Sequence, residues 1–338
     1  MGSEYRKEGL ETYIAYFGIF NLGILLKNKK HRKILFDTLI IVEIIVSIIS
    51  LMNNNMTYML MKNQEPYTGI FSQFNHYGYY LMFGILVSLM MFLITKNNYK
   101  YIYLLPYGLL LYTLLMNDTF GCILSIIVSL ILIMIFFRKY KKEIVLIFIT
   151  TLIIFVGTYR NNQNIIYKNF KSLFGDAEVV RKVIKDTKEA KKNKDNKNKD
   201  KVNINAINSI GTTRGVLWRY GLKYISERPI TGYGIETLDL LYVKDGIIQD
   251  RPHNILIQFG VFTGIPGIIL YSLFILIILF RSIKRFKYFD ELSKCIFVIC
   301  VCYLMSSMFG NSMFYTSPYF FIFLGLLTSN IFYLKKQV

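Results

Sequence analysis

Apolar side chains gather in long runs along this chain, and charged side chains gather in the short segments between the runs. At about 1.5 Å per residue, a helix of one run covers most of a bilayer core about 30 Å thick. The pattern therefore predicts an all-α polytopic membrane protein. We expect about nine transmembrane helices, over residues 10–26, 34–52, 77–95, 101–116, 120–137, 144–159, 255–280, 294–311 and 318–334.

Every second segment between these runs is basic. Lysine and arginine in short segments concentrate on the cytoplasmic side, so the other segments are expected to face outward. The net charge of +19 then comes largely from topology and from one lysine-rich insertion, and we expect no nucleic-acid partner. The basic segments are 27–33, 96–100, 138–143, 281–287 and Lys335-Lys336, and the outward segments are 53–75, 117–119, 160–252 and 312–317.

This alternation makes the first run cross from outside to inside, with its charged start on the outer face. Residues 1–9 hold no apolar core of the kind that a signal peptide needs. We therefore expect upstream helices to be missing, split off or supplied by a separate polypeptide. The alternative is that a short N-terminal tail is translocated.

Three regions follow from these assignments. Residues 1–159 form an N-terminal transmembrane bundle of six helices, 160–252 one large extracytoplasmic loop, and 253–338 a C-terminal transmembrane bundle of three helices. Within the loop, the Lys/Asn-rich stretch 182–201 is predicted to be disordered. An amphipathic helix is predicted near 213–226, where apolar residues recur at helical spacing.

Unusual chemistry is concentrated between Gly211 and Pro266. This stretch holds arginines, the single tryptophan, Gly232-Tyr233-Gly234, and Arg251-Pro252-His253-Asn254 at the start of an apolar run. Charge beside a membrane is costly and is usually retained for a function. Arginine suits phosphate recognition, and histidine is the side chain best suited to act as a base near neutral pH.

Metal and disulfide chemistry are not indicated. The loop has no Asp-X-Asp, its acids Asp239, Asp245 and Asp250 are scattered, and the four cysteines lie in or beside predicted helices. We expect no metal and no cofactor.

The chain resembles the O-antigen ligase and polymerase family of bacterial cell-surface glycan assembly. The resemblance covers nearly the whole chain, and because the segment 6–13 matches the interior of family members, it also implies missing N-terminal helices. The matching residues are Arg214, Trp218, Pro229, Gly232-Tyr233-Gly234, His253-Asn254, Leu256, Gln258, Gly264 and Gly267, with weaker matches at 6–13 and 74–80.

The resemblance implies a membrane glycosyltransferase of the inner (cytoplasmic) membrane that polymerises or ligates undecaprenyl-diphosphate-linked oligosaccharide on the outer face, as in capsule or exopolysaccharide synthesis. Its partners are the lipid-linked glycan, an acceptor glycan or lipid-linked repeat, and membrane lipid. His253, as the base, and Arg214 are the expected catalytic residues. The expected substrate-binding residues are Arg251, Arg219, Trp218, Asn254, Gly232, Tyr233, Gly234, Arg6 and Asn75.

One position departs from the family. Many members carry Ser-Arg-Gly at the outer start of a span, where this chain reads Thr119-Phe120-Gly121. Phe120 therefore stands in place of an arginine, and we take Arg251 as the candidate replacement. Asp118 is the alternative base.

Two alternatives stay open. A flippase or transporter of lipid-linked sugar is the rival class, and Glu43 within a predicted span is the ionisable residue that favours it. Within the enzyme class, the Asn, Lys and Ile bias indicates an AT-rich genome. If such a genome belongs to a bacterium with a single membrane, a lipid A core is not available as the acceptor, and a polymerase is favoured over a ligase.

Overall fold

The computed structural model describes residues 2–3, 8–52, 69–71, 74–117, 119–161, 214–247, 249, 251–311 and 313–334, and this part of the chain is almost entirely helical. The α-helices in it are α1 Leu10–Leu25, α2 Lys29–Met52, α4 Phe74–Ile94, α5 Leu104–Asn117, α6 Phe120–Phe136, α7 Lys141–Asn161, α10 Arg214–Glu227, α11 Leu238–Lys244, α12 Ile255–Arg285, α13 Glu291–Ser307 and α14 Ser317–Leu334.

Short elements complete the fold. Two 3₁₀ helices, η1 Asn98–Tyr103 and η3 Phe286–Tyr288, follow α4 and α12. An antiparallel pair of two-residue strands, β1 Gly2–Ser3 and β2 Glu8–Gly9, precedes α1. Pro106 lies in the first turn of α5, where the amide hydrogen that proline lacks would have no helical partner anyway.

The helices are those of a multi-pass membrane protein. Among the described residues, Lys29–Met52, Asn75–Ile94 and Ile255–Tyr288 are long and apolar enough to cross a bilayer, and Leu10–Leu25, Phe120–Phe136 and Ser317–Phe332 are shorter apolar helices. Large apolar side chains are exposed along α1, α2, α7 and α12, as expected for helices that face lipid. Each predicted span overlaps one observed α-helix, with ends that differ by up to five residues. The count of nine spans and the side that each loop faces stay predictions.

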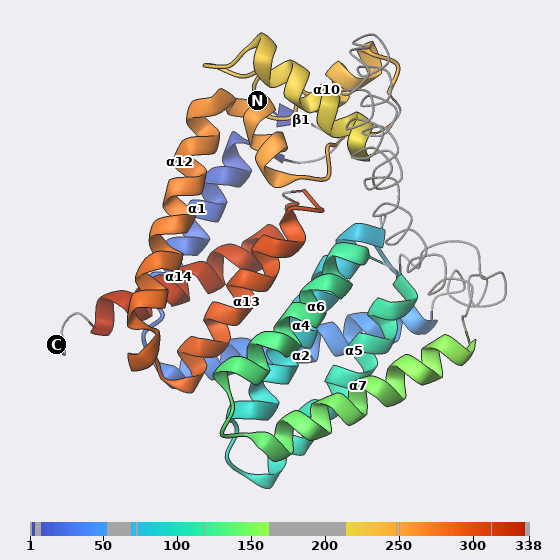
Figure 1. The fold of residues 1–338 in the computed structure, drawn as a ribbon, viewed down its shortest axis with the longest axis vertical. Helices are drawn as coiled ribbons and strands as arrows, with labels where there is room; N and C mark the ends of the chain where they lie inside the picture. The colour runs from blue at the N-terminus through green and yellow to red at the C-terminus, as the bar shows by residue number, and fades with distance from the viewer. Residues whose placement is uncertain are drawn as a thin grey trace, which may run out of the picture.

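The two ends of the bundle differ in charge. The basic segments 27–33, 96–100, 138–143 and 281–287 meet at one end, which we call the basic end. Ion pairs link three of these segments to one another or to the start of α13. Lys29 Nζ lies 2.7 Å from Asp290 Oδ2, Lys100 Nζ 2.5 Å from Glu143 Oε1, and Lys139 Nζ 2.7 Å from Glu291 Oε1. α10 and the N-terminal strands lie at the opposite end, at the top of Figure 1.

The core runs through α4, whose apolar face is buried among α2, α5, α6 and α13. Glu43 of α2 is fully buried and packs against Gly84 of α4. All four cysteines are buried and unpaired.

Candidate functional site

Five segments converge at the end of the bundle opposite the basic end, which we call the site end. They are strand β2, the start of α4, the start of α10, residues 251–254 before α12, and the turn between α13 and α14. Hydrogen bonds and ion pairs join four of these segments although they are far apart in sequence. The start of α4 joins them through a ring contact, with 5.3 Å between the ring centres of His76 and Tyr315.

His253 is at the centre of this convergence. The amide of Asn311, in the α13–α14 turn, contacts the ring, with 3.3 Å between Asn311 Nδ2 and His253 Nδ1. Burial lowers the pKa of His253 to about 4, and the positive charges of Arg214 and Arg251 and the nearby His76 act in the same direction. The imidazole is therefore neutral at physiological pH, as a proton acceptor must be.

α10 holds the backbone beside His253. Trp218 Nε1 donates to the carbonyl oxygen of Pro252 at 2.8 Å. α10 is in turn fixed by a small apolar core with α11 and the first part of α12, where Tyr242 Oη donates to the carbonyl oxygen of Leu217 at 2.9 Å. Trp218, predicted to pack on lipid or sugar, thus has a structural contact through its indole nitrogen.

Asn254 caps α12. Its Oδ1 accepts from the backbone nitrogens of Leu256 at 3.0 Å and Ile257 at 3.1 Å, which satisfies amide hydrogens that have no partner inside the helix. Its Nδ2 donates to the carbonyl oxygen of Met308 at 3.2 Å, just beyond α13. Asn254 therefore ties residues 251–254, which we call the histidine loop, to two helices.

Arg251 is part of a buried ion cluster. Its Nη2 lies 2.8 Å from Glu8 Oε2 and 2.7 Å from Glu236 Oε2, and the three side chains are at most 6% exposed. Glu8 Oε1 also accepts from the backbone nitrogen of Phe314 at 2.6 Å. Burial works against the charge on Arg251, but the two carboxylates outweigh it and raise the pKa of Arg251. This cluster joins the segment before α1, the loop after α10 and the histidine loop.

Backbone strain is found at the same place. Among the described residues, two that are not glycine have positive φ: Glu236 at 61° and His253 at 49°. The left-handed region costs a side-chain-bearing residue about 1–3 kcal/mol and is held only where the surroundings impose it. Glu236 is an ion partner of Arg251, and His253 lies two residues after it. The ion cluster and the Asn254 cap hold these two residues in the left-handed conformation.

Gly232-Tyr233-Gly234 docks against a break in α12. Pro266 has no amide hydrogen, so the carbonyl oxygen of Phe262 loses its helical partner and accepts instead from Gly234 N at 3.0 Å. Tyr233 N donates to the carbonyl oxygen of Val261 at 2.7 Å, and Ile265 N to that of Pro229 at 2.7 Å.

This docking leaves no room for side chains at two glycines. Gly232 has φ 64°, and a Cβ there would lie 2.6 Å from the Phe262 carbonyl. Gly264 at the break has φ 72°, and its Cβ would lie 2.6 Å from the Pro229 oxygen. The glycines therefore bring the loop against the α12 backbone, and their predicted contact with a lipid headgroup stays a prediction.

The other predicted residues divide into three groups. Arg214 begins α10 and acts on His253 electrostatically, so these two expected catalytic residues are brought together. Arg219 is half-buried with its guanidinium 5.2 Å from the ring centre of Tyr220, and Asn75 lies in the first turn of α4. Arg6 and Asp118 lie outside the described residues, as does the stretch 182–201.

Sequence reasoning missed His76 and Asn311 as neighbours of His253. His76 directly follows Asn75 in a matched motif, and this was the only signal for it. Asn311 is brought in by the α13–α14 turn and carried no motif. Among the described residues, no group of three or more His, Cys, Asp or Glu side chains could hold a metal ion, and metal independence stays a prediction.

The model of the O-antigen ligase family matches residues 105–272, from α5 to the middle of α12. The matched range contains Arg214, Trp218, the Gly-Tyr-Gly turn and the histidine loop. No curated protein matches the chain.

Proposed function

Because the chain belongs to the O-antigen ligase family, we propose that it transfers glycan from undecaprenyl diphosphate to an acceptor sugar at the site end of the bundle. The family implies glycosyltransferase-type activity on lipid-linked glycans. The observation that carries the assignment to this site is the neutral His253, in a strained conformation, beside Arg214 within the matched range.

In the proposed reaction, the acceptor hydroxyl attacks the anomeric carbon of the donor sugar. The bond from that carbon to the diphosphate oxygen breaks, and undecaprenyl diphosphate leaves with the bonding electrons. His253 takes the hydroxyl proton. For Nε2 to be the basic atom, the hydrogen of the neutral ring must be on Nδ1. The Asn311 amide lies beside Nδ1, and its oxygen accepts this hydrogen when the amide is rotated to place the oxygen toward the ring.

Arg214 is the proposed diphosphate ligand. Its guanidinium is always charged and donates paired hydrogen bonds to phosphate oxygens. Diphosphate bound there offsets the positive charge that lowers the pKa of His253. Burial is the larger cause of the lowered pKa and remains, but the donor substrate removes part of the charge effect and so raises the basicity of the histidine.

Arg251 has a different position. It is a candidate replacement for the missing family arginine at Phe120, but its two carboxylate partners favour a role in holding the histidine loop. We propose that Arg251 positions His253 and that Arg214 contacts the diphosphate. Polymerisation of lipid-linked repeats is the proposed outcome.

Purified protein in liposomes tests the proposal against the transporter alternative. Lengthening or transfer of an undecaprenyl-diphosphate-linked oligosaccharide, without any ion gradient, is the expected result. Movement of unchanged lipid-linked sugar across the bilayer, without a new glycosidic bond, would instead identify a flippase. The Arg214→Ala variant is expected to lose transfer, while Lys244→Ala, an exposed cation at the end of α11, is the matched control.

A further inference from the structure

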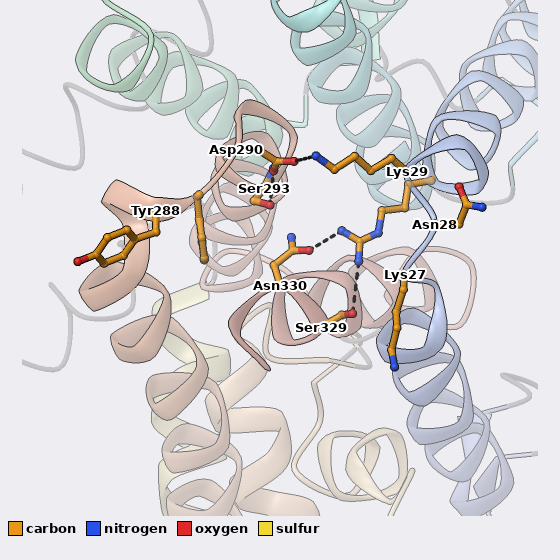
Figure 2. Close-up of a pocket in the computed structure, with 10 residues that line it drawn as sticks. Lys27, Asn28, Lys29, Tyr288, Asp290, Ser293, Ser329 and Asn330 are labelled. Carbon is orange, nitrogen blue, oxygen red and sulfur yellow. Dashed lines mark hydrogen bonds and ion pairs between the residues drawn. The ribbon is translucent and has the colours of Figure 1, made fainter. Parts of the chain in front are cut away.

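A second polar site lies at the basic end, about 45 Å along α12 from His253 if each of its residues rises 1.5 Å. It is a cavity of about 570 Å³ between the α1–α2 turn, the α12–α13 turn and the end of α14 (Figure 2). That volume is in the range of about 300–1,000 Å³ typical of ligand sites.

The lining of this cavity has excess positive charge. Lys27, Lys29 and Arg32 line it, opposed by Asp290. Both oxygens of Asp290 are engaged, because Oδ2 lies 2.7 Å from Lys29 Nζ and Oδ1 accepts from the backbone nitrogen of Ser293 at 2.9 Å. Figure 2 shows these contacts on one wall of the cavity.

Arg32 supplies a buried charge to the cavity, with the residue only 6% exposed. Its guanidinium donates to neutral acceptors: the carbonyl oxygen of Leu26 at 2.7 Å, Ser329 Oγ at 3.3 Å and Asn330 Oδ1. Among the described residues, no carboxylate lies within ion-pair distance of it. Asp290 acts on Arg32 electrostatically but is itself paired with Lys29, and burial still works against the charge on Arg32. A buried cation with so little compensation is costly, so an anion in the cavity would stabilise it.

Asn330 points a second donor at the same space. Because a guanidinium can only donate, the amide atom that faces Arg32 must be the oxygen, and the nitrogen is directed away from it. Figure 2 shows that nitrogen on the side of Asn330 that faces Ser293. Asn330 is 8% exposed, and its Nδ2 has no hydrogen-bond partner among the described residues. A buried unpaired donor calls for an acceptor.

We propose that this cavity binds a phosphate group with net negative charge, as in an anionic lipid headgroup or inorganic phosphate, and not the zwitterionic phosphatidylcholine headgroup. A phosphate offers several acceptor oxygens to Arg32, Asn330 and the two lysines at once, and its negative charge offsets their excess. Exposed apolar side chains at the basic ends of α1 and α12, Leu25 at 69% and Ile283 at 61%, lie within a few residues of the lining residues Lys27 and Tyr288. A lipid phosphate would lie at this level of a bilayer, and basic pockets between membrane helices bind such headgroups.

Thermal unfolding of the purified full chain in nanodiscs tests the proposal. One series raises the fraction of phosphatidylglycerol in phosphatidylcholine, and another adds inorganic phosphate to phosphatidylcholine alone. Bound ligand raises the unfolding temperature. A rise with phosphatidylglycerol identifies a lipid phosphate, and a rise with inorganic phosphate alone identifies a soluble ligand. Absence of a rise in both series overturns the proposal.

Asn330→Asp is the decisive variant. Its carboxylate still accepts from Arg32, so folding is supported, but the donor becomes an acceptor with negative charge. The apparent affinity for the phosphate ligand is expected to fall by about tenfold or more, because the new carboxylate repels the phosphate oxygens instead of donating to them.

Two lysine variants complete the test. Lys27→Ala, at an exposed residue of the cavity, is expected to weaken the ligand effect even if Asn330→Asp does not fold. Lys142→Ala, at an exposed residue of the same end outside the cavity, controls for general attraction to anionic lipid and is expected to keep the full effect. If both lysine variants lose the same amount, or Asn330→Asp keeps the full effect, the phosphate site is wrong.

Discussion

Two buried arginines, one at each end of the bundle, have opposite surroundings. Arg251 at the site end is 5% exposed and contacts two carboxylates, whereas Arg32 at the basic end is 6% exposed and contacts neutral oxygens. Arg251 has two carboxylate ion partners, Glu8 and Glu236. Arg32 lies beside a cavity and has no carboxylate within ion-pair distance among the described residues.

The difference shows that burial and residue type do not define what an arginine does. A guanidinium already held by carboxylates is suited to joining segments, because its hydrogen bonds are directed to fixed partners. One held only by neutral acceptors keeps the electrostatic attraction for an anion. We therefore infer that Arg251 holds chain segments together and that Arg32 binds an anion, and the following variants test that distinction.

The largest expected effect on activity concerns His253, whose loop is held by the ion pairs of Arg251. His253→Ala is expected to lower the rate of glycan transfer about 10²–10⁴-fold, the usual contribution of a general base. His31→Ala at the basic end is the matched control and should leave the rate unchanged. If His253→Ala keeps its activity and Asp118→Asn loses it, the base is Asp118.

Removal of each arginine compares the two ends directly. Arg251→Met leaves Glu8 and Glu236 buried together and is expected to cost about 3–5 kcal/mol of stability. Arg32→Met leaves neutral acceptors without their donor but also removes a costly buried charge, so it is expected to cost less, at most about 1–3 kcal/mol. Chemical unfolding of both variants in phosphatidylcholine nanodiscs, where no anionic ligand is present, measures the difference. Equal losses would contradict the distinction between the two sites.

The pH dependence of stability reports the surroundings of His253. Its pKa is about 4 in the folded chain and 6.5 ordinarily, so between these values the unfolded chain binds a proton that the folded chain does not. Stability is therefore complete above pH 6.5 and falls as the pH falls to about 4, by up to about 1.4 kcal/mol per pH unit. His253→Ala should remove this part of the slope in unfolding measured at pH 4.5 and 7.

Enzyme kinetics separate the free from the bound state of the same histidine. The acid limb of kcat/KM should lie near pH 4, while that of kcat should lie at higher pH if bound diphosphate offsets the charge of Arg214. Coincident limbs would show that the substrate does not change the basicity of His253.

The docking of the Gly-Tyr-Gly turn on α12 gives a smaller effect. Gly232→Ala combines a positive φ with a Cβ only 2.6 Å from the Phe262 carbonyl, so loop and helix must separate. Gly246→Ala has a similar φ of 73° but open space around the Cβ, and should cost only the conformational part, about 1–2 kcal/mol. Thermal unfolding should show a larger loss for Gly232→Ala.

The smallest effect is expected for Trp218→Phe. The variant keeps a smaller aromatic ring in place of the indole but loses the hydrogen bond from Nε1 to the Pro252 oxygen. Loss of that hydrogen bond should cost about 0.5–1.5 kcal/mol. A modest fall in kcat is expected because the histidine loop loses one support. A large rise in KM with unchanged kcat would instead indicate that the indole binds substrate.

Hydropathy and local motifs predicted part of the site region. α10 begins at Arg214, close to the helix start expected near residue 213. The break in α12 at Pro266 and the cap at Asn254 were not predicted, although each depends on residues only a few positions apart. The resemblance also selected Arg214 and His253, which the fold brings together. Asn311 was missed, because it reaches His253 only through a turn 58 residues away.

By itself, the sequence determined where the helices lie and that the charged segments alternate, because lipid solvation and helix geometry act on neighbouring residues. Only the tertiary structure decided which arginine is neutralised and which is not. Glu8 reaches Arg251, and Asn330 reaches Arg32, across most of the length of the chain. Such pairings depend on how whole helices pack, and no local pattern of residues encodes them.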